Sequence, residues 1–139
     1  MEGLKTVRSD FDPDETVARL EKEIVAQGMK VFSRIHHSAL AAEAGLALSP
    51  TELVIFGNPR AGTPLMQASQ TIGIDLPLKA LIWRDAFGAT WFSYNDPVWL
   101  AKRHELKGMD PVAAGMGLAL DAIALKVTRT GAAGSGGRA

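Results

Sequence analysis

The chain has 139 residues, the size of one ordinary domain, and 47% of them are hydrophobic, which excludes a largely disordered protein. Fifteen basic residues balance fifteen acidic ones, and this neutral charge argues against a general nucleic-acid binder, which needs a strong phosphate-neutralising field. Cysteine is absent, so disulfides, thiolate nucleophiles and cysteine-ligated zinc sites are excluded.

The same composition favours a cytoplasmic protein. A chain without cysteine fits a reducing compartment. Residues 1–9 contain no apolar segment of the kind that a signal peptide needs. Charged residues or glycines interrupt the longest apolar runs, so we expect no bilayer-spanning helix and no membrane partner.

The N-terminal part predicts a strand and then a helix. Residues 4–9 are expected to form the strand. Asp12 is a good N-cap, Pro13 suits the first helical position and Glu15 completes a capping box, so the helix begins at residue 13. Gly28 provides its C-terminal stop. The apolar residues that recur at helical spacing are Val17, Leu20 and Ile24.

The middle of the chain predicts two further strands. Residues 30–37 contain no helix breaker and are expected to be a strand, followed by a short Ala-rich helix that ends at Gly45. Residues 51–56 are a continuous apolar run, typical of a strand that is covered on both faces. A Gly- and Pro-containing loop then leads to Thr63-Pro64, which is expected to begin the next helix.

The last part predicts a hairpin and two helices. Residues 78–84 and 90–94 read as its two strands. Asp96-Pro97 and Asp110-Pro111 repeat the cap-plus-proline pattern and are expected to open the helices.

This order of elements predicts an α+β protein. We expect a single, mostly antiparallel sheet of about five strands with helices packed on one face, because the middle is rich in strands and the ends are amphipathic. The domain should cover residues 1–130. Residues 131–139 are Gly, Ala and Ser with one Arg, and we expect them to be a disordered tail.

Three blocks of sequence resemble a known family. They are the segments PTELVIFGNP at residues 50–59, AGTPLM at 61–66 and DLPLK at 75–79. Together they are similar to the "domain of unknown function 302" family, and the likeness covers nearly the whole chain. The resemblance implies a small TATA-binding-protein-like β-α-β4-α fold, commonly paired into a homodimer, and it implies no activity. His36 stands where the family often has an acidic residue, so a site that needs this carboxylate is not carried over.

The loop from Gly57 to Thr63 is the main candidate site. Its glycine spacing resembles a phosphate-binding loop, but Thr63 and Pro64 replace the residues that nucleotide hydrolysis needs. Free N–H groups at a helix start, together with Arg60, are suited to a carboxylate or phosphate. The structural alternative is that Asn58 and Thr63 only satisfy their own loop. The ligand-binding residues predicted here are His37, Asn58, Arg60, Gly62 and Thr63.

Other constellations carry less information. His36 and His37 are adjacent on the expected strand and point to opposite faces, so we expect no metal site, and no cofactor is called for. No spacing identifies a Ser-His-Asp triad, and turn roles explain Asp75 and Asp85 near strand ends. The role of His36 stays open, and the aromatic cluster could be core, pocket wall or subunit interface. The cluster comprises Trp83, Trp91, Tyr94 and Trp99.

Three functions follow from these observations. The leading one is a homodimer that binds a small polar or anionic molecule at the loop. The second is an enzyme that uses His37, with a partner carboxylate or hydroxyl, for acid–base catalysis. The third is a purely structural or protein-interaction module. A pocket lined by His37, Asn58 and Thr63 would favour the first two.

Overall fold

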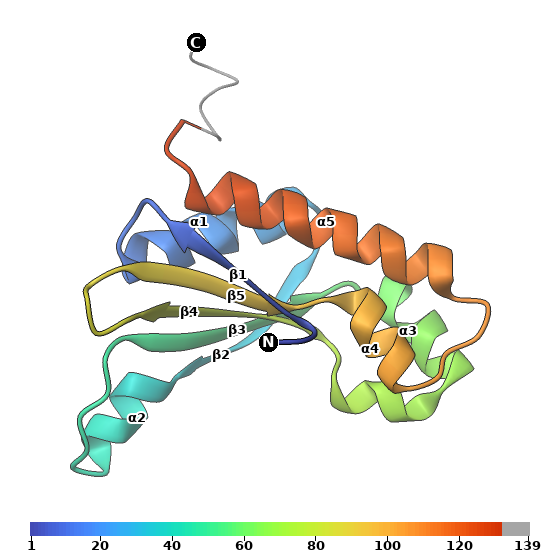
Figure 1. The fold of residues 1–139 in the computed structure, drawn as a ribbon, viewed down its shortest axis with the longest axis horizontal. Helices are drawn as coiled ribbons and strands as arrows, with labels where there is room; N and C mark the ends of the chain where they lie inside the picture. Colours follow the sequence, from blue (N-terminus) through green and yellow to red (C-terminus); the bar gives the residue numbers. More distant parts are fainter. Residues whose placement is uncertain (132–139) are drawn as a thin grey trace.

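The structure is a computed structural model that describes residues 1–131, so the tail expected at 131–139 lies outside the described residues except for Gly131. Five antiparallel strands form one sheet in the order β1-β5-β4-β3-β2 (Figure 1). Their bounds are β1 Leu4–Ser9, β2 Lys30–His36, β3 Thr51–Gly57, β4 Leu78–Arg84 and β5 Thr90–Asn95. The predicted α+β class and the single five-stranded antiparallel sheet are confirmed.

Two long helices, α1 (Pro13–Ala26) and α5 (Asp110–Thr128), cover one face of this sheet (Figure 1). Alternate side chains of the central strands point at these helices, because successive residues of a strand face opposite sides. The side chains that meet in this core are Val54, Phe56, Ala80, Ile82 and Phe92 from the sheet and Leu20, Ile24, Leu120, Ile123 and Val127 from the helices. The predicted packing of the two end helices on one face is confirmed.

The opposite face of the sheet keeps apolar side chains partly exposed. Leu53, Leu81 and Ile55 alternate with the core residues of β3 and β4 and therefore point away from α1 and α5. Trp83 and Trp91 are cross-strand neighbours on this face, with ring centroids 6.3 Å apart. We call these five residues the open sheet face.

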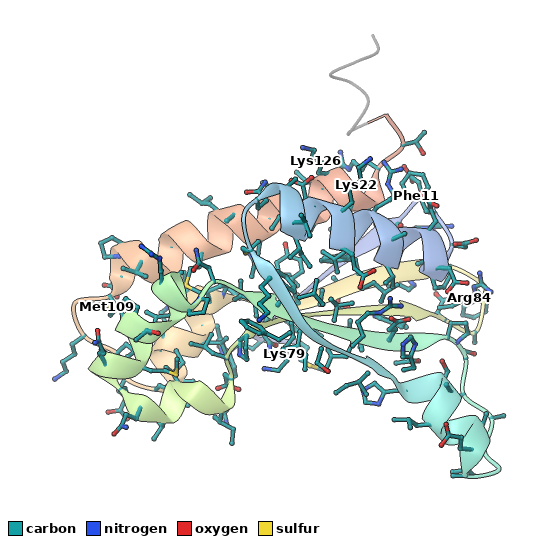
Figure 2. The ribbon with its side chains drawn as sticks, turned by 180° about the vertical axis from the view of Figure 1, so that it is seen from behind. Phe11, Lys22, Lys79, Arg84, Met109 and Lys126 are labelled. Atoms are coloured by element: carbon teal, nitrogen blue, oxygen red, sulfur yellow. The ribbon has the colours of Figure 1, made fainter. Side chains whose placement is uncertain are left out.

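Shorter helices gather at the two ends of the sheet. The helix α3 (Pro59–Ala68), the 3-10 helix η1 (Gln70–Ile74) and α4 (Pro97–Arg103) lie at one end, around a small second core of Leu65, Ile72 and Leu100. Met109, which packs against this second core, lies at the same end, and Arg84 lies at the opposite end (Figure 2). The helix α2 (His37–Glu43) extends from the end of β2 (Figure 1).

Two helix starts show where local signals succeed and fail. Asp12 caps α1 as predicted, since its Oδ1 accepts a hydrogen bond from Glu15 N at 2.8 Å. The predicted start at Thr63-Pro64 is wrong, because α3 already begins at Pro59 with Asn58 as its N-cap. Asn58-Pro59 carries the same cap-plus-proline pattern, so the sequence offered two starts and Pro64 ends up inside the helix.

Candidate functional site

A cavity of about 500 Å³ lies between α3, α5 and the adjoining ends of β3 and β4. Asn58, Thr63 and Gly115 on its wall are exposed, whereas Leu120 and Ile123 are buried. The cavity therefore opens between α3 and α5 and ends against the main core. Its wall is almost entirely apolar, because Asn58 and Thr63 are the only residues with polar side chains that residues 1–131 contribute to it.

Three methionines contribute to this wall, Met29 from the turn before β2, Met66 from α3 and Met116 from α5. Thioether side chains are unbranched and flexible, so they adapt to ligands of different shape. Gly115 leaves space beside them, since a Cβ atom placed there meets no atom within 4 Å. The wall is therefore adaptable on its α5 side.

The structure brings together only part of the predicted ligand set. Asn58, Gly62 and Thr63 line the cavity. Arg60 lies in the same turn of α3 but is exposed and does not line it.

His37 lies at the other end of the β2–β3 hairpin. Gly57 pairs with Lys30 at the cavity end of this hairpin, whereas Glu52 pairs with His36 at the far end. His36 lies six residue steps along the strand from Lys30, which corresponds to roughly 20 Å at the usual rise per residue. His37 is exposed at the start of α2 and does not share the cavity with the loop, contrary to the predicted arrangement.

The amide groups at the start of α3 are already bonded. Arg60 N donates to Asn58 Oδ1 at 2.9 Å, and the N–H groups of Ala61 and Gly62 donate to the Asn58 carbonyl oxygen at 2.9 and 3.1 Å. Pro59 has no N–H group. The free donors on which the predicted anion site depended are therefore occupied by Asn58.

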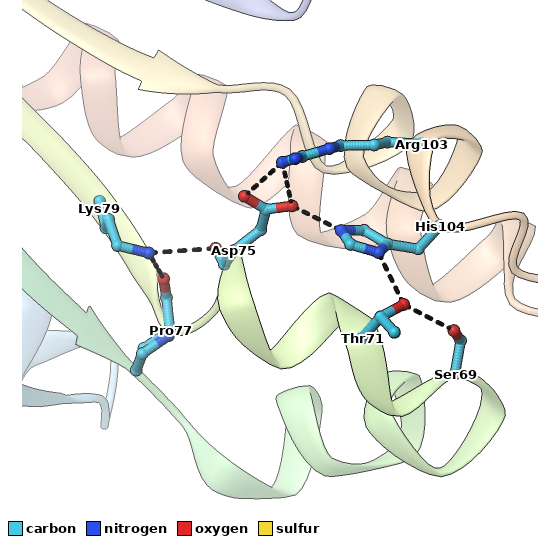
Figure 3. A network of polar contacts seen from close by, with 7 residues as sticks. All are labelled: Ser69, Thr71, Asp75, Pro77, Lys79, Arg103 and His104. Carbon is cyan, nitrogen blue, oxygen red and sulfur yellow. Dashed lines mark hydrogen bonds and ion pairs between the residues drawn. The ribbon is translucent and has the colours of Figure 1, made fainter.

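A second candidate site, which is polar, lies beside the cavity, where η1 meets the end of α4 (Figure 3). Asp75 Oδ2 lies 2.5 Å from His104 Nε2, and both Asp75 oxygens accept hydrogen bonds from Arg103 Nη1 at 3.0 and 2.8 Å. On the other side of the ring, His104 Nδ1 lies 2.9 Å from Thr71 Oγ1. Ser69 Oγ lies 3.1 Å from the same Thr71 oxygen.

Lys79 joins this network through the backbone. Its Nζ donates to the carbonyl oxygens of Asp75 and Pro77, both at 3.2 Å (Figure 3). Burial lowers the pKa of the Lys79 ammonium group, and the charge of Asp75 opposes this effect in part.

Sequence reasoning noticed Asp75 but missed its partners. Thr71 and Asp75 are four residues apart, and His104 follows 29 residues after Asp75. No local pattern predicts that the end of α4 lies against η1, so only the packing of the second core brings these groups together.

The structure also shows the contacts of the residues whose roles the sequence left open. His36 Nδ1 lies 3.3 Å from Glu52 Oε1. Tyr94 is part of the main core and donates to Asp121 Oδ1 at 2.6 Å. Trp99 packs against the second core.

The two tryptophans of the open sheet face are tied to polar neighbours. Trp83 Nε1 donates to Ser93 Oγ at 2.9 Å, and Trp91 Nε1 donates to Asp85 Oδ2 at 2.8 Å. Within residues 1–131, no three His, Asp or Glu side chains gather in a way that would hold a metal ion.

Comparison with known proteins places this chain in a family. The family model described as "Domain of unknown function DUF302" matches residues 5–123. The chain belongs to the DUF302 family. A solved structure of an uncharacterised conserved DUF302 protein from Bacillus stearothermophilus has the same fold, with a TM-score of 0.83 and 22% sequence identity over 93% of this chain and 100% of that chain. The predicted family resemblance is confirmed, and this family has no established function.

Curated relatives are more similar in sequence but longer. "Fluoride-specific ion channel FluC 1" of Brucella suis biovar 1 (strain 1330) is 54% identical over 104 residues, which are 75% of this DUF302 chain and 41% of that protein. "Fluoride-specific ion channel FluC 1" of Brucella abortus biovar 1 (strain 9-941) is equally similar over 38% of its length. The chain therefore spans only about two-fifths of the curated relatives it matches.

The sequence predicted no helix that could span a bilayer, but one helix among residues 1–131, α5, is long and apolar enough by length and composition to cross a membrane. In this fold Leu120, Ile123 and Val127 of α5 are buried against the sheet. Burial in the core thus accounts for part of the apolar character of α5, whereas Leu118 and Leu125 of the same helix are exposed.

Proposed function

We propose that this DUF302 domain binds a small molecule with a mainly apolar body in the cavity between α3 and α5. The observation that carries the proposal is the cavity itself, whose volume of about 500 Å³ lies within the usual range of small-molecule sites. An apolar body fits against Leu120 and Ile123, while a polar end of the ligand fits at the mouth, beside Asn58 and Thr63.

The proposed ligand is mainly apolar, whereas the sequence predicted a small polar or anionic one. The amide groups of Arg60, Ala61 and Gly62 are bonded to Asn58, so they offer little to a carboxylate or phosphate. Apolar contact is then the main source of affinity, at about 25 cal/mol for each Å² of apolar surface removed from water.

The test is retention and displacement of a ligand. Protein purified from its own host is examined by native mass spectrometry for a bound small molecule, and the fluorescent probe 1-anilinonaphthalene-8-sulfonate is titrated into the stripped protein. We expect a retained apolar compound, or one saturable probe site with a dissociation constant in the micromolar range. A native protein that carries no compound and shows no saturable probe binding contradicts the proposal.

We also propose that the domain forms a homodimer through the open sheet face. The supporting observation is that Leu53, Leu81, Trp83 and Trp91 place apolar surface side by side on this face, and closed two-fold dimers are the commonest soluble oligomers. Sedimentation equilibrium at micromolar concentration should report twice the 14.8 kDa monomer mass. Leu81→Glu should give a folded monomer. Val25→Glu, on the exposed side of α1, should remain a dimer. A wild-type protein that remains strictly monomeric contradicts the dimer.

The curated relatives favour a second candidate function, an accessory role beside a membrane channel, exerted from the cytoplasm. The relatives are named as fluoride channels, and the matched segment is only about two-fifths of each. We propose that the domain binds such a channel and changes its conductance. Fluoride efflux from vesicles that contain a fluoride channel of the same host is measured with and without the domain. An unchanged efflux rate, together with no co-sedimentation of the domain with these vesicles, refutes this role.

A further inference from the structure

The network around His104 has a defined direction of hydrogen bonding. The Asp75 carboxylate accepts from Arg103 at both oxygens, and a carboxylate can only accept. His104 Nε2, 2.5 Å from Asp75 Oδ2, must therefore carry the proton and donate it. In the neutral ring this leaves the lone pair on Nδ1, which accepts from the Thr71 hydroxyl at 2.9 Å.

The relay thus runs from the hydroxyl of Thr71 through His104 to Asp75, as Figure 3 shows. Since Thr71 uses its own proton toward His104, its oxygen accepts from Ser69 Oγ at 3.1 Å. The Thr71 O–H bond is polarised by a base that is itself oriented by a carboxylate. This is the arrangement that activates hydroxyl nucleophiles.

Burial divides the network into a protected part and an accessible part. The side chains of His104 and Asp75 are only 8% and 15% exposed, whereas Thr71 is exposed. His104 also directly follows Arg103, the last residue of α4. The base is therefore held in a fixed orientation, and an electrophile from solvent can reach the hydroxyl.

We propose that Thr71 is a nucleophile that accepts acyl groups from small activated acyl donors such as aryl esters and thioesters. His104 is its general base and Asp75 is a positioning residue. Thr71 Oγ1 forms a bond to the carbonyl carbon, its proton passes to His104 Nδ1, and the bond from the carbonyl carbon to the leaving group breaks. The leaving group departs with the bonding electron pair and takes up the proton from His104. Water then attacks the Thr71 ester, with His104 as base, and regenerates the hydroxyl.

This inference is independent of the apolar cavity and of the proposed ligand. It assigns the catalytic histidine to His104, whereas the sequence suggested His37, because His104 has both a carboxylate and a hydroxyl within hydrogen-bond distance. The Ser69 hydroxyl lies one step further from the base and is expected to be dispensable.

The test is acyl transfer from 4-nitrophenyl acetate to the full chain. Release of 4-nitrophenolate is followed by absorbance, and the acetylated residue is located by peptide mass spectrometry. We expect an acetyl group on Thr71 and a rate that Thr71→Val lowers at least tenfold, while Thr71→Ser and Ser69→Ala retain most of it. His104→Gln should lower the rate by roughly 10²-fold or more, as expected for loss of a general base.

Controls separate this role from a structural one. Thr71→Val keeps the shape of the side chain, and its unfolding midpoint should stay close to that of the wild type. A rate that is retained in Thr71→Ser and lost in Thr71→Val would show that the hydroxyl group is needed, rather than the shape of the side chain. Acetylation confined to lysines or to Ser69, or equal rates for wild type and Thr71→Val, overturns the proposal.

Discussion

Gly115→Leu is expected to raise the stability of the protein while it abolishes ligand binding in the cavity. Gly115 lies in the interior of α5 and lines the cavity, and a Cβ atom there meets nothing within 4 Å. Glycine costs about 1 kcal/mol of helix propensity relative to alanine, and leucine only a few tenths. The leucine side chain gains further apolar contact at the mouth, of the order of 0.8 kcal/mol for each methylene group that becomes buried.

The net expectation is a gain of about 1 kcal/mol or more in the free energy of unfolding. For a chain of this size, 1 kcal/mol corresponds to roughly 4 °C in Tm. The same side chain occupies the entrance beside Met116 and Ala119, so the affinity for the naphthalene probe should fall at least tenfold, or about 1.4 kcal/mol. Thermal unfolding and probe titration measure the two effects on one sample.

Ala114→Leu is the matched control. Ala114 is exposed on the same helix but does not line the cavity, so probe binding should be unchanged and stability nearly so. Gly115→Ala separates the two effects, because it should keep most of the propensity gain and fill little of the cavity. Unaltered probe affinity in Gly115→Leu would show that the ligand does not enter between α3 and α5, and a lowered Tm would show that the space beside Gly115 is not free.

Other predictions concern the helices and the acid stability of the core. Asp12→Ala should lower the free energy of unfolding by about 1 kcal/mol, because it removes the acceptor for Glu15 N; an unchanged urea midpoint would argue against this cap. Ile24→Ala should cost about 2–5 kcal/mol, since Ile24 is fully buried, and Val25→Ala, at the exposed neighbouring position, should change stability by less than about 0.5 kcal/mol in the same urea titration. Burial raises the pKa of Asp121, but hydrogen bonds from Tyr94 and Lys5 and the charge of Lys5 outweigh this and hold its pKa below the usual value. A lowered folded pKa stabilises the protein above the unfolded value, and this stabilisation is lost as the pH falls through the folded pKa. The urea midpoint should therefore decrease less between about pH 6 and about pH 3 in Asp121→Asn than in the wild type, and equal decreases would contradict the assignment.

The sequence by itself determined most of the secondary structure and the fold class. Asp12-Pro13 and Asp96-Pro97 carry their helix signals within three or four residues, and both aspartates accept the expected hydrogen bonds from backbone N–H groups. The run from Thr51 to Phe56 predicted the strand β3 for a similarly local reason. Such signals predict helix starts and strands from the sequence because capping and side-chain alternation act between near neighbours in the chain.

Tertiary structure decided between local signals that were equally good. Asn58-Pro59 and Thr63-Pro64 both satisfy the rules for a helix start, and only the first is used. The choice depends on where β3 ends and on how Leu65 packs in the second core, and neither is visible in a short window of sequence. Because the helix begins after Asn58, the amide groups that the anion-binding hypothesis required donate to Asn58 instead.

Only the tertiary structure assembled the two candidate sites. The cavity exists because α5, at the end of the chain, lies across from α3, and the network exists because the last turn of α4 brings His104 against η1. These neighbours are tens of residues apart, and no periodic pattern links them. The physical reason is that burial of apolar surface in the two cores joins residues at any separation along the chain, whereas caps and turns act between residues a few positions apart.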